Sequence, residues 1–440
     1  MKKFFSPLSL LVLIPVLLFA LSACKNEKKT IFDALATDSN TRDLIVVISD
    51  LHLGADLQYA EINNNRKPLA AFLEQIRLSG CVKELVINGD FIDEWYIPST
   101  TNTYNGKDQA DFAQRIVDTN KEVFDQLKQI IQEQKVLVTH VPGNHDLAIT
   151  ESTIQHILPG INQARDTKGL GTYSPVDHPE IAIEHGHRYN IMCAPDPLSN
   201  QDIAPGTILP TGYFLTRIAA LHLTQGCKQN TDTIPSILLK PEADPNQAFL
   251  YGYWKLWSWW INKFPTENSF AEKTIVTHVD GFTDTISIKD LRPYQETQGG
   301  DIQVKLFNGV QDNWANRSTL NHVPVPISLH DAIEFAASAV GTDTMAVVQY
   351  FANPISTKRI VVFGHTHEAK LTEYTTHNGQ KAIYANSGTW IDHNKDGNTL
   401  MDFVVITPQN SSDAHSTTRV ALYNFMNEVV TETAKDSLRL

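Results

Sequence analysis

Short runs of apolar, often β-branched residues alternate with helical patterns in the first part of the chain. Continuous apolar runs are typical of strands buried on both faces. They predict strands at 44–49 (LIVVIS), 84–88 (ELVIN), 135–141 (KVLVTHV) and 180–184 (EIAIE). Apolar residues at helical spacing predict a helix within 67–78 and a long amphipathic helix over 108–134. This βαβ rhythm is typical of a layered α/β core.

After a long interval the strand pattern returns. The later apolar runs predict strands at 359–363, 382–386, 401–406 and 418–425. We therefore expect an α/β (α+β) core built from two pieces of sequence, residues 41–190 and 355–426. Residues 427–440 are expected to form a C-terminal tail.

The interval 191–354, called the insert below, differs in pattern. It holds proline-rich connectors and predicted helices at 212–224, 246–263 and 328–352, so it is predicted to be largely helical. The segment 251–260 (YGYWKLWSWW) brings four tryptophans together: Trp254, Trp257, Trp259 and Trp260. Three interpretations are open. The cluster is the core of the insert, or it forms a cap that offers an apolar wall to a substrate, or it rests at a bilayer interface, where Trp is enriched.

The N-terminus predicts an export signal rather than a folded element. Residues 1–23 hold two lysines, then an apolar run shorter than the roughly 20 residues that span a bilayer, then Ser22 and Ala23. The sequence LSAC at 21–24 resembles the lipobox of bacterial lipoproteins. That resemblance implies a lipid on Cys24 and a protein anchored in the cell envelope outside the cytosol, facing the periplasm or the cell surface. The alternative is an uncleaved membrane anchor. Residues 24–40 are expected to be a flexible tether.

Composition limits the partners of the chain. The 440 residues include 36 basic and 49 acidic side chains, a formal charge of −13, which excludes broad electrostatic binding to nucleic acid. Besides Cys24, the cysteines are Cys81, Cys193 and Cys227, and none has metal-ligand spacing. We expect these three to be buried small apolar residues, and a Cys193–Cys227 disulfide stays open.

Five short polar motifs come directly after predicted strands. They are SDLHLG with Asp50 and His52, NGDFIDEW with Asp90 and Asp93, PGNHD with Asn144, His145 and Asp146, EHGHRYN with His185 and His187, and FGHTHE with His365 and His367. Ligands of α/β sheets bind at the carboxyl ends of strands, so we expect these side chains to converge on one edge. Carboxylates, imidazoles and an amide without cysteine suit two divalent ions of Mn, Fe or Zn.

The order D-x-H, G-D-x-x-D, G-N-H-D, H, G-H-x-H resembles the calcineurin-like metallophosphoesterase superfamily, over residues 43–190 and 355–408. The resemblance implies a four-layer αββα sandwich of two mixed β-sheets and a dinuclear metal centre. It also implies hydrolysis of a phosphate ester or anhydride by attack of a metal-bridging hydroxide. The substrate would be a phosphorylated small molecule or lipid.

Carried over residue by residue, the resemblance implies a role for each motif side chain. Asp50, His52 and His367 would bind one metal, Asn144, His185 and His365 the other, and Asp90 would bridge them. His145 would protonate the leaving oxygen, and Asp93 would orient His145. In EHGH the family's ligand precedes the glycine, which favours His185; His187 would then face the pocket or lie behind the ligand.

The chain also departs from the best-known branch of this superfamily. Phosphoprotein phosphatases have a phosphate-binding arginine after the second motif, where this chain has Glu94 and Trp95. Arg188 is one candidate replacement, and Asn386 either touches substrate or closes a turn. GDFIDEW is closer to the UDP-diacylglucosamine pyrophosphohydrolases, whose helical insert holds acyl chains. An enzyme of that kind, acting on a lipidic or nucleotide-linked diphosphate, is therefore the alternative, although those enzymes work at the cytosolic face. A non-enzymatic surface-binding lipoprotein is disfavoured, because the motif set is intact.

Overall fold

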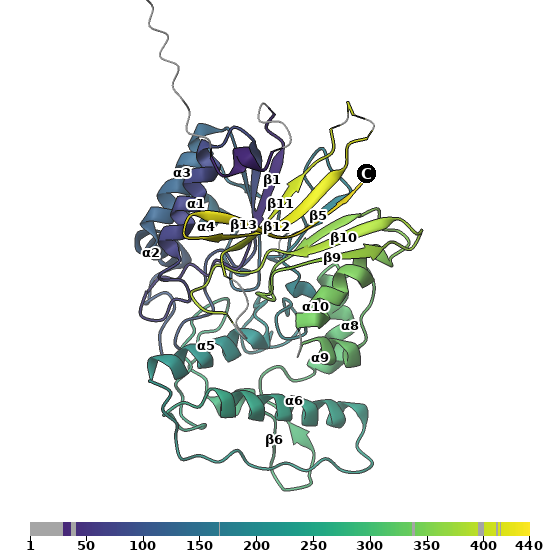
Figure 1. The fold of residues 1–440 in the computed structure, drawn as a ribbon. Helices are drawn as coiled ribbons and strands as arrows, with labels where there is room; N and C mark the ends of the chain where they lie inside the picture. Colours follow the sequence, from purple (N-terminus) through teal and green to yellow (C-terminus); the bar gives the residue numbers. More distant parts are fainter. Residues whose placement is uncertain are drawn as a thin grey trace, which may run out of the picture.

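A computed structural model describes residues 30–36, 41–166, 168–336, 339–394, 400–410, 412–413 and 415–440. The predicted signal 1–23 and the predicted lipidation site Cys24 lie outside these residues. Two mixed β-sheets form the centre of the molecule, and helices flank them (Figure 1).

The larger sheet has seven strands in the order β13-β12-β11-β1-β2-β3-β4. Their bounds are β1 Leu44–Ile48, β2 Val82–Asn88, β3 Leu137–Val141, β4 Asn162–Gln163, β11 Asp402–Thr407, β12 Thr418–Met426 and β13 Val429–Leu438. Strands β1 to β4 pair in parallel, and β1, β11, β12 and β13 pair antiparallel. The carboxyl ends of the parallel strands β1, β2 and β3 therefore lie at one edge of the sheet, where the first three motifs begin.

The smaller sheet has four strands in the order β5-β8-β10-β9. Their bounds are β5 Ile181–Ile183, β8 Ile360–Phe363, β9 Lys370–Thr375 and β10 Lys381–Asn386. Strands β5, β8 and β10 are parallel, and β9 pairs antiparallel with β10. Since β5 and β8 are neighbours, the two motifs that follow them are brought together although about 180 residues separate them.

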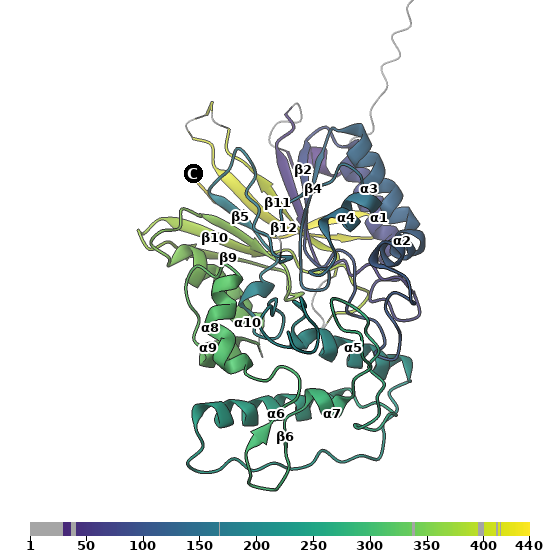
Figure 2. The ribbon, with the colours of Figure 1, turned by 180° about the vertical axis from the view of Figure 1, so that it is seen from behind.

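The alternation of side chains along the strands creates the layers. In β1, Val46 and Ile48 pack toward helices of the first layer, whereas Ile45 and Val47 pack toward the smaller sheet. The first-layer helices are α1 Arg66–Leu78, α2 Gln109–Thr119, α3 Lys121–Glu133 and α4 Glu151–Ile157 (Figure 2). The expected four-layer αββα sandwich of two mixed sheets is confirmed.

The insert supplies the fourth layer. Its helices are α5 Thr211–Thr224, α6 Pro245–Lys263, α7 Ile288–Leu291, α8 Val310–Leu320, α9 Leu329–Ala336 and α10 Ala339–Ala346, followed by the π-helical turn Val347–Phe351, with a short hairpin of β6 Tyr294–Gln295 and β7 Ile302–Gln303. Phe363 of β8 packs into the same apolar cluster as Phe351. Residues of the insert thus cover the outer face of the smaller sheet, although the sequence pattern predicts the insert as a unit separate from the core.

Three sequence predictions need correction. The helix predicted at 108–134 is two helices, because Asn120 leaves helical geometry and its side-chain amide donates to the carbonyls of Gly54 and Ile116. The predicted C-terminal tail contains strand β13, which pairs along the whole of β12. Part of the predicted tether is folded: Phe32 is buried, with its ring against those of Phe72 and Phe403.

The cysteines are also placed differently from the expectation. Cys193 and Cys227 are not joined to each other, and Cys227 is exposed at the surface. Cys81 is buried, as expected of a small apolar residue.

Candidate metal centre

The loops that follow the strands carry the predicted motifs to one place. Asp50 and His52 follow β1, Asp90 follows β2, and Asn144 follows β3. From the smaller sheet, the fourth motif follows β5 and the fifth follows β8. The expected convergence is found: the side chains come within a few ångströms of one another, as the distances below show.

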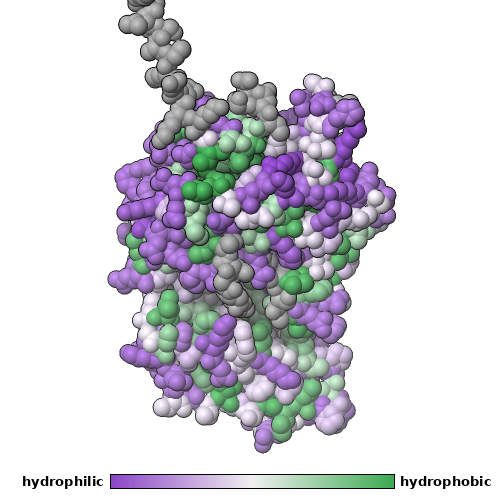
Figure 3. Space-filling model, viewed as in Figure 1, coloured by the Kyte–Doolittle hydropathy of each residue, from purple (hydrophilic) through white to green (hydrophobic). Residues whose placement is uncertain are grey.

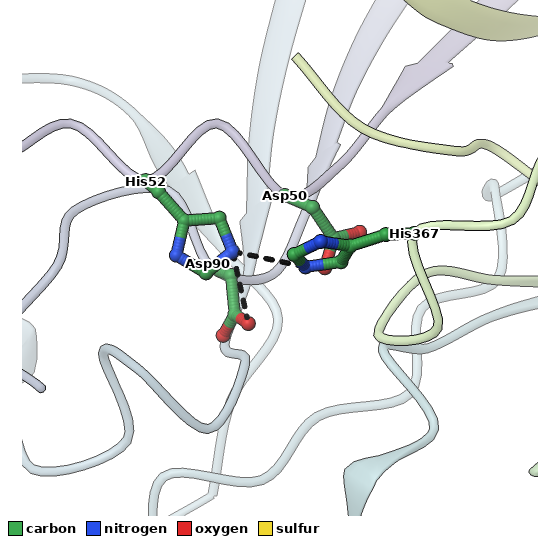
Figure 4. A group of neighbouring side chains, drawn as sticks. All are labelled: Asp50, His52, Asp90 and His367. Carbon is green, nitrogen blue, oxygen red and sulfur yellow. Dashed lines mark hydrogen bonds and ion pairs between the residues drawn. The ribbon is translucent and has the colours of Figure 1, made fainter. Parts of the chain in front are cut away.

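A first group consists of Asp50, His52, Asp90 and His367, whose ligand atoms all lie within 4.8 Å of one another (Figure 4). Nε2 of His52 lies 3.2 Å from Nε2 of His367, and the latter lies 3.2 Å from Oδ1 of Asp50. Oδ2 of Asp90 lies 3.7 Å from Nε2 of His52. Two carboxylates and two imidazole nitrogens facing one point are the donor set of a divalent cation.

A second group shares Asp90 with the first. It adds His185 and His365, again with all ligand atoms within 4.8 Å of one another. Oδ2 of Asp90 lies 3.2 Å from Nε2 of His185. Asn144 lines one cavity together with Asp90 and His365, and the Oδ1 atom of Asn144 is buried without a hydrogen-bond partner among the described residues. A buried amide oxygen without a partner fits a cation ligand.

Hydrogen bonds at the far side of two imidazoles fix which nitrogen carries the proton. Nδ1 of His52 donates to Oδ2 of Asp93 at 2.8 Å, and Nδ1 of His185 donates to the carbonyl of Asn88 at 2.9 Å. In the neutral form of both rings, Nε2 is therefore left with a lone pair directed at Asp90. This arrangement, with the outer nitrogen bonded to a carboxylate or a carbonyl, is common to metal-binding histidines.

The geometry favours His185 over His187 as the ligand of the fourth motif. His187 is buried beside His185, with ring centroids 5.4 Å apart, but it belongs to neither group. Both of its ring nitrogens are without a hydrogen-bond partner among the described residues. Burial, together with His185 and His365, lowers the pKa of His187 well below its ordinary value, so the ring is neutral.

The backbone at the centre is strained. The residues Asp50, His52, Asp90, His365 and His367 have φ angles of 53°, 47°, 49°, 71° and 60°, all in the left-handed region. Side chains other than glycine rarely adopt this conformation, and its cost is typically about 1–3 kcal/mol for each residue. Such strain concentrates at functional sites, where the surrounding packing holds it in place.

Two glycines allow the loops to approach one another. A Cβ added at Gly143 would lie 2.1 Å from Oδ1 of Asp90 and 2.3 Å from its backbone nitrogen. A Cβ added at Gly89, which has φ +85°, would lie 2.3 Å from Nδ1 of His185. Any larger residue at these positions displaces a candidate ligand.

The electrostatics of the centre are those of a cation site. Burial would raise the pKa of Asp90, but the nearby His185, His145 and His52 hold it well below its ordinary value. Burial would lower the pKa of His52, but Glu61, Asp93 and Asp90 raise it well above its ordinary value. The cluster therefore keeps its carboxylate ionised and attracts positive charge, whether protons or metal ions.

His145 lies beside the centre and is paired with Asp93. Its Nδ1 is 2.9 Å from Oδ2 of Asp93, and its backbone N–H donates to Oδ1 of Asp90 at 2.8 Å. The ring of Trp95 stacks on the imidazole, with centroids 5.0 Å apart. With Nδ1 directed at Asp93, Nε2 at the opposite end of the ring is left for the cavity that His145 lines.

Sequence reasoning missed two residues here. Glu61 lies in a loop without a motif, and its Oε2 comes within 3.2 Å of Nδ1 of His52. The sequence distinguishes Trp95 as an aromatic after the second motif but assigns it no role at the site, whereas in the structure its ring stacks on that of His145. Nothing in the pattern around Glu61 identifies it, whereas an aromatic two residues after Asp93 was a usable signal.

A cavity of about 420 Å³ lies between the core and the insert, where the surface is hollowed (Figure 3). Asp90, Asn144 and His145 line one side, and Leu256, Trp259 and Trp260 of α6 line the other, among other residues.

The tryptophans of α6 differ in their burial. Trp257 is completely buried in the insert, whereas Trp259 is 54% exposed. Core packing and an apolar wall over the site are thus both present in one helix.

Two of the weaker candidates do not reach the cavity. Arg188 is corrected as a phosphate clamp: its guanidinium is buried, pairs with Glu184 at 2.9 Å and donates to the carbonyl of Gly171. Asn386 closes a turn, because its amide donates to the carbonyl of Gly364 and its Oδ1 accepts from the N–H of Gly388. Asn386 thereby braces the loop of the fifth motif.

Comparison with known families agrees with this geometry. Residues 44–206 match the family model of the calcineurin-like phosphoesterases. This part of the chain is a calcineurin-like phosphoesterase domain. The match covers the first four motifs of the phosphoesterase, and the structure adds the fifth by bringing His367 to within 3.2 Å of Asp50. Among curated proteins, none matches the chain.

Proposed function

We propose that the protein is a metal-dependent phosphoesterase that uses two divalent ions. Asp50, His52 and His367 would hold the first ion, Asn144, His185 and His365 would hold the second, and Asp90 would be shared. The observation that carries the proposal is the pair of ligand groups with Asp90 in common. When bound, two such cations supply Lewis-acid charge to phosphoryl oxygens and lower the pKa of water.

His145 is proposed as the general acid. The contact with Asp93 keeps the proton of the neutral ring on Nδ1 and favours a second proton on Nε2, because the carboxylate stabilises the charged ring. Burial would lower the pKa of His145, but Asp93 and Asp90 raise it above its ordinary value. A protonated His145 can give its Nε2 proton to the leaving oxygen of an ester, while Trp95 fixes the plane of the ring.

Two features of the chain bear on the nature of the substrate. Glu94 and Trp95 stand where phosphoprotein phosphatases have an arginine, which argues against a protein substrate. The apolar wall formed by Leu256, Trp259 and Trp260 favours a second candidate function, cleavage of a lipidic or nucleotide-linked diphosphate. Both candidates use the same metal centre and differ in the group that leaves.

The test combines metal analysis with a substrate survey. The purified protein should contain up to two divalent ions per chain, and chelation should abolish hydrolysis that Mn²⁺, Fe²⁺ or Zn²⁺ restores. Phosphate monoesters, diesters and pyrophosphates should be assayed in parallel, since they distinguish an esterase from a pyrophosphohydrolase. A protein that binds no divalent metal and hydrolyses none of the three classes would contradict the proposal.

We further propose that a lipid on Cys24 anchors the protein in the cell envelope. The lipobox-like segment LSAC supports this placement. In the part of the chain that the structure describes, no helix is long and apolar enough to cross a membrane. Labelling of cells with a fatty-acid analogue tests the anchor: Cys24→Ser should lose the label, and labelling that persists in this variant would contradict it.

A further inference from the structure

The cavity of about 420 Å³ beside the metal centre, here called the catalytic cavity, has no lysine or arginine in its wall in the part of the chain that the structure describes. Glu94 and Trp95 stand where an arginine would follow the second motif, and Arg188 pairs with Glu184 instead of reaching the cavity. Phosphate oxygens that face this wall therefore need neutral hydrogen-bond donors, because a buried oxygen without a donor is costly.

Asn190 lines the catalytic cavity and offers a donor of that kind. Its side-chain Oδ1 accepts a hydrogen bond from the backbone N–H of Met192 at 2.9 Å. This contact fixes the amide, because only its oxygen can face an N–H donor, and Nδ2 is turned to the opposite side. Nδ2 makes no hydrogen bond to any residue that the structure describes, and it is not buried. Its two N–H groups are thus available to a ligand in the cavity.

The backbone of Asn190 is held as firmly as its amide. Its N–H donates to the carbonyl of His187 at 3.1 Å, and its carbonyl accepts from the N–H groups of Cys193 and Ala194 at 3.0 and 2.7 Å. A donor that is already held in one position loses little conformational entropy when it binds a ligand. Asn190 is therefore preorganised for a hydrogen bond into the cavity.

A buried ion pair fixes the turn that leads to Asn190. Arg188 pairs with Glu184 at 2.9 Å, and the hydroxyl of Tyr189 donates to the other carboxylate oxygen of Glu184 at 2.6 Å. All three side chains are buried. The 3₁₀ turn His187–Tyr189 is thus tied to the end of β5, and Asn190 is the residue that directly follows it.

We infer that Asn190 is a substrate-binding residue that donates through Nδ2 to an oxygen of the phosphate group. The inference deepens the proposed function and rests on it, because it assumes that the phosphate of the substrate lies in the catalytic cavity. A hydrogen bond to a charged acceptor is stronger than one between neutral groups, so this contact should contribute about 10–100-fold to the affinity for phosphate.

Binding of inorganic phosphate to the metal-loaded protein tests the inference without turnover. Asn190→Asp is the decisive variant. Its carboxylate keeps an oxygen for the N–H of Met192 but replaces the Nδ2 donor by a negatively charged acceptor. We expect phosphate to bind at least about 10-fold more weakly to this variant. Asn190→Ala also loses the donor but adds no charge, so its loss of affinity should be smaller.

The order of these two variants separates substrate binding from a structural role. Asn190→Ala gives up the hydrogen bond with Met192, whereas Asn190→Asp keeps it. If Asn190 only held its own turn, the alanine variant would have the lower thermal stability and also the weaker binding of phosphate. Phosphate binding that is weaker in Asn190→Ala than in Asn190→Asp, or equal to the wild type in both, would overturn the inference.

Asn102→Asp is the matched control. Oδ1 of Asn102 also accepts the N–H of the residue two positions further on, Tyr104, at 3.1 Å. Asn102 is half-buried and lies outside the described lining of the catalytic cavity. This variant adds the same charge in the same local geometry and should bind phosphate as the wild type does. Metal analysis ensures that equally loaded proteins are compared. Equal weakening in Asn102→Asp and Asn190→Asp would show a general effect of charge and overturn the inference.

Hydrolysis of p-nitrophenyl phosphate and of bis-p-nitrophenyl phosphate separates the inference from the proposed function. If neither ester is hydrolysed while Asn190→Asp still weakens the binding of phosphate, the proposed function fails and the inference stands. If the esters are hydrolysed, and Asn190→Asp leaves KM, kcat and the affinity for phosphate unchanged, the proposed function stands and the inference fails.

Discussion

Oδ2 of Asp93 lies 2.9 Å from Nδ1 of His145, and the same oxygen accepts a hydrogen bond from Nδ1 of His52 at 2.8 Å. The other oxygen of Asp93 is held by the backbone N–H groups of Trp95 and Tyr96. One fixed carboxylate thus orients a candidate metal ligand and a candidate acid together. A ligand and an acid held by one group keep a constant distance, which positions the reacting atoms.

The first prediction separates the acid from the ligands. His145→Ala should keep its metal content and lose about 10²–10⁴-fold in kcat, most for esters with poor leaving groups, because only those need a proton in the transition state. Metal analysis and kcat for a series of leaving groups are the measurements. Loss of metal together with activity would identify His145 as a ligand instead.

The second prediction concerns the shared carboxylate. Asp90 contributes to both ligand groups, and its Oδ1 also accepts the backbone N–H of His145. Asp90→Asn should lower the occupancy of both metal sites and abolish turnover, because an amide has no charge to offset two cations. Mass spectrometry of metals on the purified variant gives the occupancy. Two metals per chain with normal activity would refute the assignment.

A third prediction uses the close approach at Gly143. Gly143→Ala places a Cβ 2.1 Å from Oδ1 of Asp90, so the loop or the carboxylate must move. We expect a destabilisation of about 1–3 kcal/mol and a fall in metal content. Gly379→Ala is the control, since its Cβ meets nothing within 4 Å and its positive φ of +80° is the only feature that opposes the substitution. Its metal content should equal that of the wild type, and equal metal loss in both variants would contradict the argument from contact.

The sequence predicts the two sheets and the sheet edge at which the five motifs meet, because both follow from local patterns of residues. Buried strands such as β1 are continuous apolar runs, and the motifs sit where parallel strands end. The positive φ angles at Asp50 and His365 follow from the packing of five loops against one another, and no residue pattern encodes them. Glu61 reaches His52 only through a loop path that the tertiary structure decides.

The boundaries of the predicted tether and of the predicted C-terminal tail differ from the structure for a similar reason, because contacts between distant residues decide them. The residues of β13 are mostly exposed or half-buried, so their sequence is too polar to predict a strand. Pairing with β12 is what makes this segment a strand. Phe32 is a single aromatic in a polar stretch, and only the pocket between Phe72 and Phe403 makes it part of the core. Arg188 lies within the fourth motif, but its guanidinium forms an ion pair with Glu184 and is not directed at the cavity.

A fourth prediction concerns pH and Glu94, which is buried with its Oε1 accepting from the hydroxyl of Tyr104 at 2.5 Å. Burial raises the pKa of Glu94 from its ordinary 4.5 to about 7. The folded state therefore binds a proton that the unfolded state releases between these values. The corresponding stability is present below pH 4.5 and is lost as the pH rises through 7, by about 3 kcal/mol at most.

Glu94→Gln tests this linkage, because glutamine can still accept from Tyr104 but cannot ionise. The variant should match the wild type in unfolding free energy near pH 4.5 and exceed it by up to about 3 kcal/mol at pH 8. Urea unfolding at several pH values measures the difference. A difference that is constant across this range would show that Glu94 does not titrate in the folded protein.

The last prediction distinguishes two tryptophans of one helix. Trp257 is completely buried, so Trp257→Ala should cost about 3–5 kcal/mol of stability and lower activity on every substrate in proportion to the folded fraction. Trp259 is 54% exposed and lines the catalytic cavity. Its replacement by alanine should change stability by less than about 0.5 kcal/mol, as is usual at exposed positions. It should nevertheless raise KM for esters with large apolar groups more than for p-nitrophenyl phosphate, because only the larger groups reach α6. Thermal unfolding and KM for paired small and large esters give both quantities, and an equal rise in KM for the two would show that Trp259 takes no part in substrate choice.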